Sequence, residues 1–216
     1  MSEVKLQWVT PDADKMIGYM ARVSNIKATP DDPAEKLIAY LIKHKHWSPF
    51  EMANACVEIN TTRDIARQII RHRSLHFQEF SQRYSEAPEE PEYSGARLQD
   101  HKNRQNSIPV EDSELIKAWL NVQQTVWSFC WMAYQGALKL GIAKELARKV
   151  LPEGLTRSRM YANGTIRDWL HYLSVRLGPE TQLEHREVAQ QILTVLEDAC
   201  PTIFKAARQA GVIAPA

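Results

Sequence analysis

The sequence predicts an α+β protein, a single helix-rich domain with a small, mostly antiparallel sheet. Apolar residues recur at helical spacing in most segments, whereas the segments that alternate like strands are few and short. The 216 residues are enough for one domain with its own core. We find no internal repeat. We therefore predict that residues 1–216 form one domain.

Each element rests on a local signal. Alternation of polar and apolar residues predicts the strands, and apolar residues at helical spacing predict the helices. We predict strands at 4–9, 53–60, 80–85 and 155–162. We predict helices after Thr10-Pro11 to residue 23, from Asp32-Pro33-Ala34-Glu35 to residue 42, at 62–70, 112–140 and 143–151, from Thr165 to residue 177, at 180–200, and before Gly211.

Helix starts are predicted by capping residues. Thr10-Pro11 is typical of an N-cap followed by a first-turn proline. Asp32 and Glu35 have the spacing of a capping box. Residues 48–51, Ser-Pro-Phe-Glu, predict one short helical turn. Residues 85–110 are rich in Pro, Glu, Gly, Ser and Asn, which predicts a long surface loop.

The helix predicted at 112–140 is apolar on more than one face. A helix of this kind is buried in a core or in a subunit interface. The sequence therefore predicts that one side of this helix contacts either the rest of the chain or another copy of it.

Composition excludes several classes of partner. The formal net charge of +1 argues against bulk binding of nucleic acid or other polyanions. The cysteines are far apart and form no CxxC pair, which favours a reducing compartment. Residues 1–7 lack the apolar core of a signal peptide, and no apolar run approaches the length of a membrane span. We expect a cytoplasmic protein without a membrane partner.

The stretch from Gln68 to Tyr84 concentrates Arg71, Arg73 and Arg83 around one carboxylate, Glu79. Guanidinium groups this close repel one another unless an anion binds between them, and phosphate oxygens match the guanidinium fork. Gln68 and Arg71, three residues apart, are predicted on the same flank of the helix. Beyond Arg73 the helical pattern stops, so we expect free backbone N–H groups there.

Two other interpretations stay open at this point. A basic helix end exposed to water would carry the same charges without a ligand. A nucleic-acid-binding module would use the arginines with aromatic neighbours as a stacking platform, although the near-neutral net charge argues against it. Those aromatic neighbours are Phe77, Phe80 and Tyr84. His44 and His46 have no third ligand placed to complete a metal site, so we predict no metal.

The motif Arg71-His72-Arg73, followed after seven residues by Ser81, resembles the signature of the flavin-dependent thymidylate synthases. The resemblance extends over nearly the whole chain. Blocks in that family's order and spacing are Ala21-Arg22-Val23-Ser24, His46 with Ser48-Pro49-Phe50-Glu51, Ala66-Arg67-Gln68, Ala147-Arg148 with Val150-Leu151-Pro152, Arg167 with Trp169 and His171, Arg176, and Gln182 with Glu184.

This resemblance implies an FAD-dependent methyltransferase that makes dTMP from dUMP by reductive methylation. It implies 5,10-methylenetetrahydrofolate as the carbon donor and NADPH as the reductant of the flavin. It also implies a homotetramer with active sites shared between subunits, which suits the helix at 112–140, and no nucleic-acid partner.

The resemblance also implies roles for single residues. The nucleotide set is Gln68, Ile69, Ile70, Arg71, Glu79, Phe80, Ser81, Gln82, Arg83, Arg148 and Arg176. The flavin set is His46, Ser48, Arg71, His72, Arg73, Glu79, Thr165, Ile166, Arg167 and His171, with His46 also near the folate. Arg176 is the implied catalytic residue, because a cation near the uracil would stabilise negative charge that develops on the ring.

Some assignments keep an alternative. The family pattern aligns after Pro152 only with a one-residue shift, so Asn163 and Thr165 compete for one flavin contact. Arg148 and Arg176 also fit favourable contacts with helix dipoles, and His171 also fits a hydrogen-bonded core histidine. Ser81 has no assigned base, so we expect it to bind the nucleotide and not to act as a nucleophile.

Overall fold

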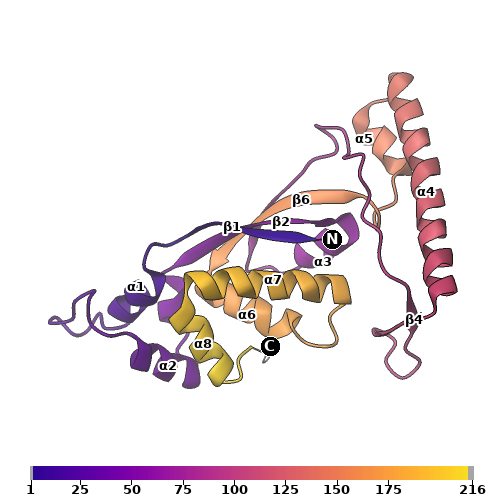
Figure 1. The fold of residues 1–216 in the computed structure, drawn as a ribbon. Coiled ribbons are helices and arrows are strands. Elements are labelled where there is room, and N and C mark those ends of the chain that lie inside the picture. The colour runs from indigo at the N-terminus through magenta and orange to yellow at the C-terminus, as the bar shows by residue number, and fades with distance from the viewer. Residues whose placement is uncertain (1, 214–216) are drawn as a thin grey trace. The chain divides into compact units, whose positions relative to one another are not determined.

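The computed structural model describes residues 2–213, and helices dominate it (Figure 1). A four-stranded sheet has the order β1-β2-β6-β3, and a smaller sheet pairs β4 with β5 antiparallel. The strands are β1 Glu3–Val9, β2 Asn54–Thr62, β3 His76–Glu79, β4 Arg97–Gln99, β5 Ser107–Pro109 and β6 Arg157–Thr165. The helix-rich α+β fold class predicted from the sequence is confirmed.

The helices follow the predicted order along the chain. The α-helices are α1 Ala13–Met20, α2 Glu35–Lys43, α3 Arg63–Ile69, α4 Ser113–Lys139, α5 Lys144–Ala147, α6 Ile166–Arg176, α7 Leu183–Ala199 and α8 Pro201–Gln209. The short 3-10 helices are η1 Ser48–Glu51 and η2 Arg148–Val150. The helix predicted at 143–151 is therefore divided into α5 and η2.

The chain falls into two compact units. We call Asn60–Ile69 and Gln78–Met160, with Ser2, the α4 unit. We call Glu3–Ile59, Ile70–Phe77 and the chain from Tyr161 onward the α6 unit. Each unit is described by itself, and the assignment of the whole chain to one domain stays a prediction.

The core of the α6 unit lies where its helices pack on one another and on β1. α7 packs against β1, α8 packs against α2, and α6 packs against α7 (Figure 1). Trp169 and Tyr172 of α6 are fully buried, and the indole N–H of Trp169 donates to the Ala55 carbonyl at 3.0 Å. At Gly18 of α1, an added Cβ would lie 2.4 Å from Ala34 Cβ, so only glycine permits this approach to the start of α2.

The core of the α4 unit is smaller. Trp127 and Tyr134 of α4 are buried, and the ring of Trp131 stacks on that of Trp127 with centroids 5.4 Å apart. The predicted surface loop is tied to this helix. The Gln123 side chain accepts from Ser94 N–H and donates to the Ser94 carbonyl, each at 2.9 Å. Part of the loop is therefore fixed, and it also carries the β4–β5 pair.

The predicted helix caps have mixed outcomes. Asp112 caps α4 by accepting from the N–H groups of Glu114 and Leu115, and Thr165 forms a capping box with Asp168 at the start of α6. Thr10 does not cap α1. The N-cap residue of α1 is Asp12, whose backbone is in the left-handed conformation. Asp32 accepts from Thr29 N–H and from the Thr29 hydroxyl, so its carboxylate stabilises the preceding turn and not α2.

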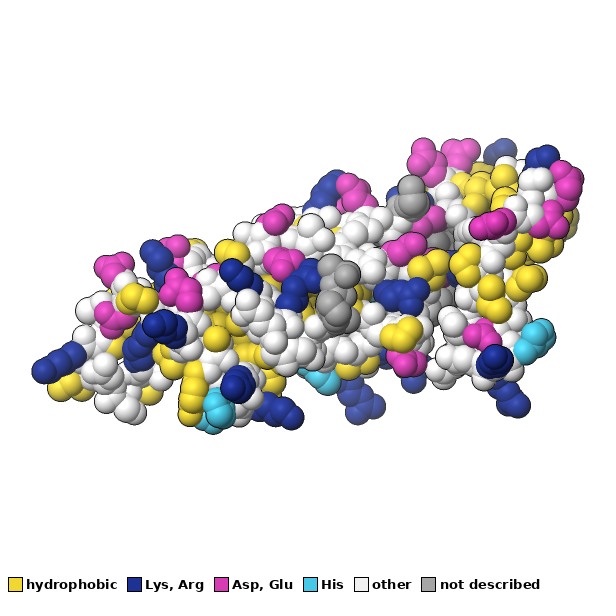
Figure 2. Space-filling model, turned by 60° about the horizontal axis from the view of Figure 1, so that its bottom comes forward, with side chains coloured by type: hydrophobic (Ala, Val, Ile, Leu, Met, Phe, Trp, Pro, Cys, Tyr) yellow, Lys and Arg dark blue, Asp and Glu magenta, His cyan; other side chains and the backbone are white. Residues whose placement is uncertain are grey.

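One face of α4 is apolar and exposed. Figure 2 shows hydrophobic side chains gathered at the right of the view, over α4 and α5. Exposed apolar side chains on α4 include Trp119, Val126, Phe129 and Met132, of which Phe129 is 69% exposed. Trp127 and Tyr134 hold the opposite side against the unit's core. The predicted multi-faced helix is therefore buried on one side only within the described chain.

Candidate functional site

The arginine-rich signature begins where α3 ends. α3 stops at Ile69, one residue before the predicted end, so Arg71 lies in the following turn. The expectation that Gln68 and Arg71 share a helix flank is therefore wrong. Ile69 is buried, whereas Gln68 and Ile70 are half-buried. Turn geometry breaks the helical periodicity here.

The three signature residues face different environments. Arg71 and Arg73 are exposed, and His72 between them is buried. The His72 ring lies 5.2 Å from the His171 ring and meets the Tyr172 ring edge-on at 5.3 Å, measured between centroids. Burial lowers the pKa of His72, and the nearby His171 and Arg176 lower it further. His72 therefore favours its neutral form, with Nε2 unpaired among the described residues.

A cavity of about 610 Å³ lies in the α6 unit beside this histidine cluster. Its lining includes Thr165, Arg167 and His171, three residues of the implied flavin set, and also Trp47 and Ser74. The Ser74 hydroxyl is buried and has no hydrogen-bond partner in the part of the chain that the structure describes. Trp47 is a lining residue that the sequence analysis did not single out.

His171 is exposed and lines the cavity, so the alternative of a buried core histidine is wrong. The predicted apolar helix carries its apolar face at Trp169, Leu170 and Leu173, all of which are buried. His171 lies off that face. Arg167, one turn earlier, forms an ion pair with Glu51 of η1 at the rim of the same cavity.

The competing candidates for the flavin contact differ in their hydrogen bonding. The Thr165 hydroxyl lies 2.6 Å from Asp168 Oδ2 and accepts from Asp168 N–H, so the capping box occupies it. The Asn163 Oδ1 atom is buried without a partner among residues 2–213. Ile166 has a fully buried side chain, and its N–H donates to the Ala53 carbonyl at 2.9 Å.

His46 and Ser48 lie at η1, also in the α6 unit. His46 is exposed, with its ring centroid 5.9 Å from that of Tyr40. Ser48 lines a second cavity of about 630 Å³ together with Ala21, Arg22 and Val23, which belong to another sequence block of the resemblance. The structure therefore brings two distant blocks, 21–24 and 48–51, to one surface.

The segment from Phe80 to Ser85 is a turn and not the predicted strand. β3 ends at Glu79, and the N–H groups of Tyr84 and Ser85 both donate to the Ser81 carbonyl. The N–H of Phe80 donates to the Arg159 carbonyl at 2.8 Å, so the expected free donor at Phe80 is absent. Strand pairing therefore ends at Phe80, and a tight turn follows. The alternation of side chains in the sequence could not predict this turn.

This turn presents Ser81 and Arg83 to a cavity of about 590 Å³ in the α4 unit. Lys144 and Glu145 of α5 line the opposite wall, and Arg83 Nε lies 3.3 Å from Glu145 Oε2. Gln82 is buried, with Nε2 unpaired within the described residues. Arg148 is half-buried; it is the C-cap of α5 and lies in the last turn of η2, so its predicted position at a helix end is confirmed.

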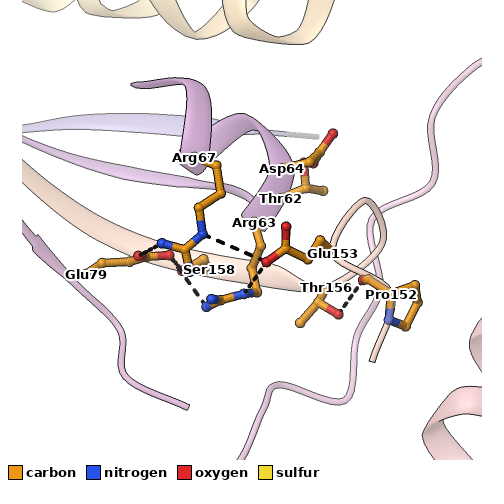
Figure 3. A network of polar contacts seen from close by, with 9 residues as sticks. All are labelled: Thr62, Arg63, Asp64, Arg67, Glu79, Pro152, Glu153, Thr156 and Ser158. Carbon is orange, nitrogen blue, oxygen red and sulfur yellow. Dashed lines mark hydrogen bonds and ion pairs between the residues drawn. The ribbon is translucent and has the colours of Figure 1, made fainter. Parts of the chain in front are cut away.

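Glu79 is held by three donors in the α4 unit (Figure 3). Its Oε1 accepts from the Ser158 hydroxyl at 3.0 Å and lies 3.5 Å from Arg63 Nη1, and its Oε2 accepts from Arg67 Nη1 at 3.1 Å. Glu153 Oε1 lies 3.9 Å from Arg63 Nε and 3.8 Å from Arg67 Nε. The positive charges of the two arginines thus balance the negative charges of the two carboxylates.

Arg176 ends α6, and its Nε is buried with no partner among the residues that the structure describes. Its positive charge lowers the pKa of His72 and of His185. His185 of α7 is fully buried and hydrogen-bonds the Tyr172 hydroxyl at 3.0 Å. The sequence analysis missed this pair, because a histidine in an amphipathic helix carries no signal of its partner on another helix.

The fold matches that of an enzyme that methylates uridine nucleotides. Residues 5–202 match the family model described as thymidylate synthase complementing protein. A solved structure with a similar fold is the UMP/dUMP methylase PolB from Streptomyces cacaoi bound with 5-Br dUMP. Its TM-score is 0.88 at 27% sequence identity, over 100% of this chain and 98% of that chain.

Two curated relatives show to which family of thymidylate synthases the chain belongs. The chain is 44% identical over 195 residues to a probable flavin-dependent thymidylate synthase of Paramecium bursaria Chlorella virus 1, covering 90% of each chain. It is 47% identical over 193 residues to the flavin-dependent thymidylate synthase of Synechocystis, covering 88% of this chain and 87% of the relative. The chain belongs to the flavin-dependent thymidylate synthase family. Among residues 2–213, no helix is long and apolar enough to cross a membrane.

Proposed function

We propose that this protein converts dUMP to dTMP by reductive methylation, with 5,10-methylenetetrahydrofolate as the carbon donor, NADPH as the reductant and FAD as the cofactor. Membership of the flavin-dependent thymidylate synthase family supports the reaction. The single structural observation that carries the proposal is the cavity of the α6 unit. It gathers Thr165, Arg167 and His171 beside the buried His72 of the signature.

The polar side chains of the α6 unit suit a flavin, because they offer hydrogen-bonding atoms that have no partner in the described chain. His72 Nε2, the Ser74 hydroxyl and Asn163 Oδ1 are buried without partners among the described residues. Polar atoms of this kind cost about 1–3 kcal/mol each unless a ligand pairs with them. Exposed Arg71 and Arg73 supply charge for a pyrophosphate, and Trp47 and Leu170 supply apolar wall for a ring.

Roles within the flavin set follow from these contacts. We assign the polar contact to Asn163, because the Thr165 hydroxyl is occupied by the capping box. Arg167 is available to a ligand if it leaves Glu51. Ser48 presents a polar group from η1, and His46 presents one from the segment just before it. When bound, the flavin supplies the reducing equivalents. His46, exposed beside this site, is our candidate for the folate.

Most of the proposed nucleotide set lies in the α4 unit, whereas Ile70, Arg71 and Arg176 belong to the α6 unit. Arg83 and Arg148 would hold the dianionic phosphate, because the guanidinium fork matches its oxygens. Ser81 and the unpaired Nε2 of Gln82 add donors beside Arg83. Glu79, fixed by its three donors, is an acceptor for N–H or O–H groups of the nucleotide. Gln68, Ile69, Ile70 and Phe80 complete the proposed set.

Arg176 is the proposed catalytic residue. Its guanidinium has a buried, unpaired Nε among the described residues, and its charge lowers the pKa of His72 and of His185. A cation kept free of counter-ions is suited to stabilise negative charge as it develops on the uracil ring. This role requires no enzyme nucleophile, so Ser81 serves binding.

The assembly we propose is a homotetramer with active sites shared between subunits. The exposed apolar face of α4 supports it, because contiguous apolar surface of this kind marks protein interfaces. The cysteines Cys56, Cys130 and Cys200 are unpaired. Free thiols agree with a reducing compartment, and we propose the cytoplasm.

The test is formation of dTMP from dUMP, 5,10-methylenetetrahydrofolate and NADPH by protein purified with FAD. We expect a yellow protein that makes dTMP only when all three substrates are present. A colourless protein that forms no dTMP and shifts single-stranded DNA would contradict the proposal and favour a nucleic-acid-binding module. Omitting each substrate in turn is the control for dTMP carried through purification.

A further inference from the structure

Arg63 is a buried cation outside every sequence block of the family resemblance. It is the first residue of α3, its side chain is 8% exposed, and its backbone N–H donates to the Thr156 carbonyl at 2.9 Å. A guanidinium is rarely buried unless carboxylates pair with it, because removing it from water is costly. Its acidic partners are Glu79 and Glu153, and Arg67 lies one turn along the same helix.

Arg63 and Arg67 act on Glu79 from opposite sides of its carboxylate. Arg63 Nη1 lies near Oε1, which also accepts a hydrogen bond from the Ser158 hydroxyl. Arg67 Nη1 donates to Oε2 (Figure 3). A carboxylate contacted at both oxygens cannot rotate without losing a contact. It still has acceptor sites left, since each oxygen accepts more than one hydrogen bond.

We propose that Arg63 is a positioning residue: it holds the Glu79 carboxylate in one orientation as a fixed acceptor for the nucleotide. The inference rests on the proposed function, which places Glu79 against dUMP. Arg63 is too buried to reach a ligand, whereas Arg67 is 42% exposed at its side chain. We therefore assign its effect on the nucleotide to its contact with Glu79, the acidic partner that belongs to the nucleotide set.

The test compares Arg63→Met, Glu79→Gln and the double variant by titrating dUMP into the flavin-loaded protein. Arg63→Met should weaken dUMP binding roughly ten-fold, as expected when a charge-assisted contact is lost. The KM for dUMP should rise with a smaller change in kcat. The double variant should bind dUMP no more weakly than Glu79→Gln alone, because the two residues act as one unit.

Arg157→Met is the matched control. Arg157 is also a partly buried arginine of the α4 unit, placed 3.9 Å from Glu90 and 3.8 Å from Glu92. It should keep the parent affinity for dUMP. Parent affinity in Arg63→Met, or effects of Arg63→Met and Glu79→Gln that simply add, would overturn the inference.

If Arg63→Met does not fold, Arg63→Lys carries the test. Lysine keeps the charge and loses the fork that contacts the carboxylate from one side. We expect several-fold weaker dUMP binding with unchanged FAD content, and parent affinity would again overturn the inference. If the parent protein itself does not bind dUMP, the proposed function has failed, and the positioning role fails with it.

Discussion

His72, Ser74, Asn163 and Arg176 each bury a polar side-chain atom that has no hydrogen-bond partner among residues 2–213. All four belong to the α6 unit. Native proteins pair almost all buried polar groups, because each unpaired one is costly. They lie in the unit that holds most of the proposed flavin set, which supports a binding role over a packing role, since packing alone would favour apolar side chains there.

Replacing Arg176 separates chemistry from cofactor binding. Arg176→Ala should retain FAD, because the proposed flavin set lies elsewhere on α6 and on other segments. Formation of dTMP should fall roughly a hundredfold, the scale for losing a preorganised charge-stabilising group. Arg176→Lys should recover only part of the activity. Initial rates and FAD absorbance are measured together. Parent-like turnover in Arg176→Ala would contradict the catalytic role and leave Arg176 only a structural role at the end of α6.

His185 makes stability depend on pH. Burial, then the charge of Arg176, then His72 lower the pKa of His185 to about 4 from its ordinary 6.5. Between these values the unfolded chain binds a proton that the folded chain does not. The free energy of unfolding therefore falls as the pH drops from about 6.5 toward 4, by roughly 3 kcal/mol. Above 6.5 this residue adds no pH dependence.

The measurement is urea unfolding at about pH 7 and about pH 5 for the parent and for His185→Phe. The variant should lose less stability on acidification, although its absolute stability changes because the bond to Tyr172 is lost. His72 titrates in the same direction and remains in both proteins. Equal losses in the two proteins would show that His185 is not the titrating group.

The family resemblance implied a set of site residues, and the structure gathers three of them, Thr165, Arg167 and His171, at one cavity. The resemblance could not predict that Glu79 is held by Arg63, because that contact joins a strand end to a helix start through side chains. The roles themselves stay predictions until the variants are measured.

At the scale of elements, the long helices α4, α6 and α7 were predicted well because each carries several turns of apolar periodicity. The error at 80–85 has a clear cause. A run of mixed polar and aromatic residues has the alternation of a strand, and only the hydrogen bonds onto the Ser81 carbonyl define the turn. The cap at Asp32 failed because its carboxylate accepts from the N–H of Thr29, three residues earlier in the same turn. The cap at Thr10 failed because its hydroxyl accepts from the N–H of the distant Asn54 at 2.9 Å.

One contact between elements fixes the start of α8. The Asp14 carboxylate accepts from the N–H groups of Thr202 and Ile203 at 2.9 and 3.2 Å, so a residue of α1 caps a distant helix. Asp14→Ala should lower the free energy of unfolding by about 1 kcal/mol, the usual cost of a lost cap. Lys15→Ala, on the exposed side of the same helix, is the control. Equal thermal midpoints for both variants would contradict the capping role.

At the scale of the whole molecule, the exposed apolar face of α4 decides the expected assembly. Phe129→Glu places a charge at the centre of that face and should convert the proposed tetramer into smaller species, because a buried unpaired charge is costly. Asn121→Glu adds the same charge at a polar position of the helix and should leave the mass unchanged. Light scattering with FAD present gives the mass. A monomeric mass for the parent protein, or a tetrameric mass for Phe129→Glu, would contradict the proposal that this face of α4 forms the subunit interface.

The close approach of Gly18 to Ala34 restricts how this chain can vary. A single change to alanine at position 18 would place two methyl groups 2.4 Å apart, well inside contact distance. The same change is less strained when residue 34 loses its own methyl group, because the nearest atom is then the Cα of residue 34 at 3.2 Å. Among descendants of this sequence, alanine at 18 should therefore arise together with glycine at 34. The history of position 34 therefore decides whether position 18 can change.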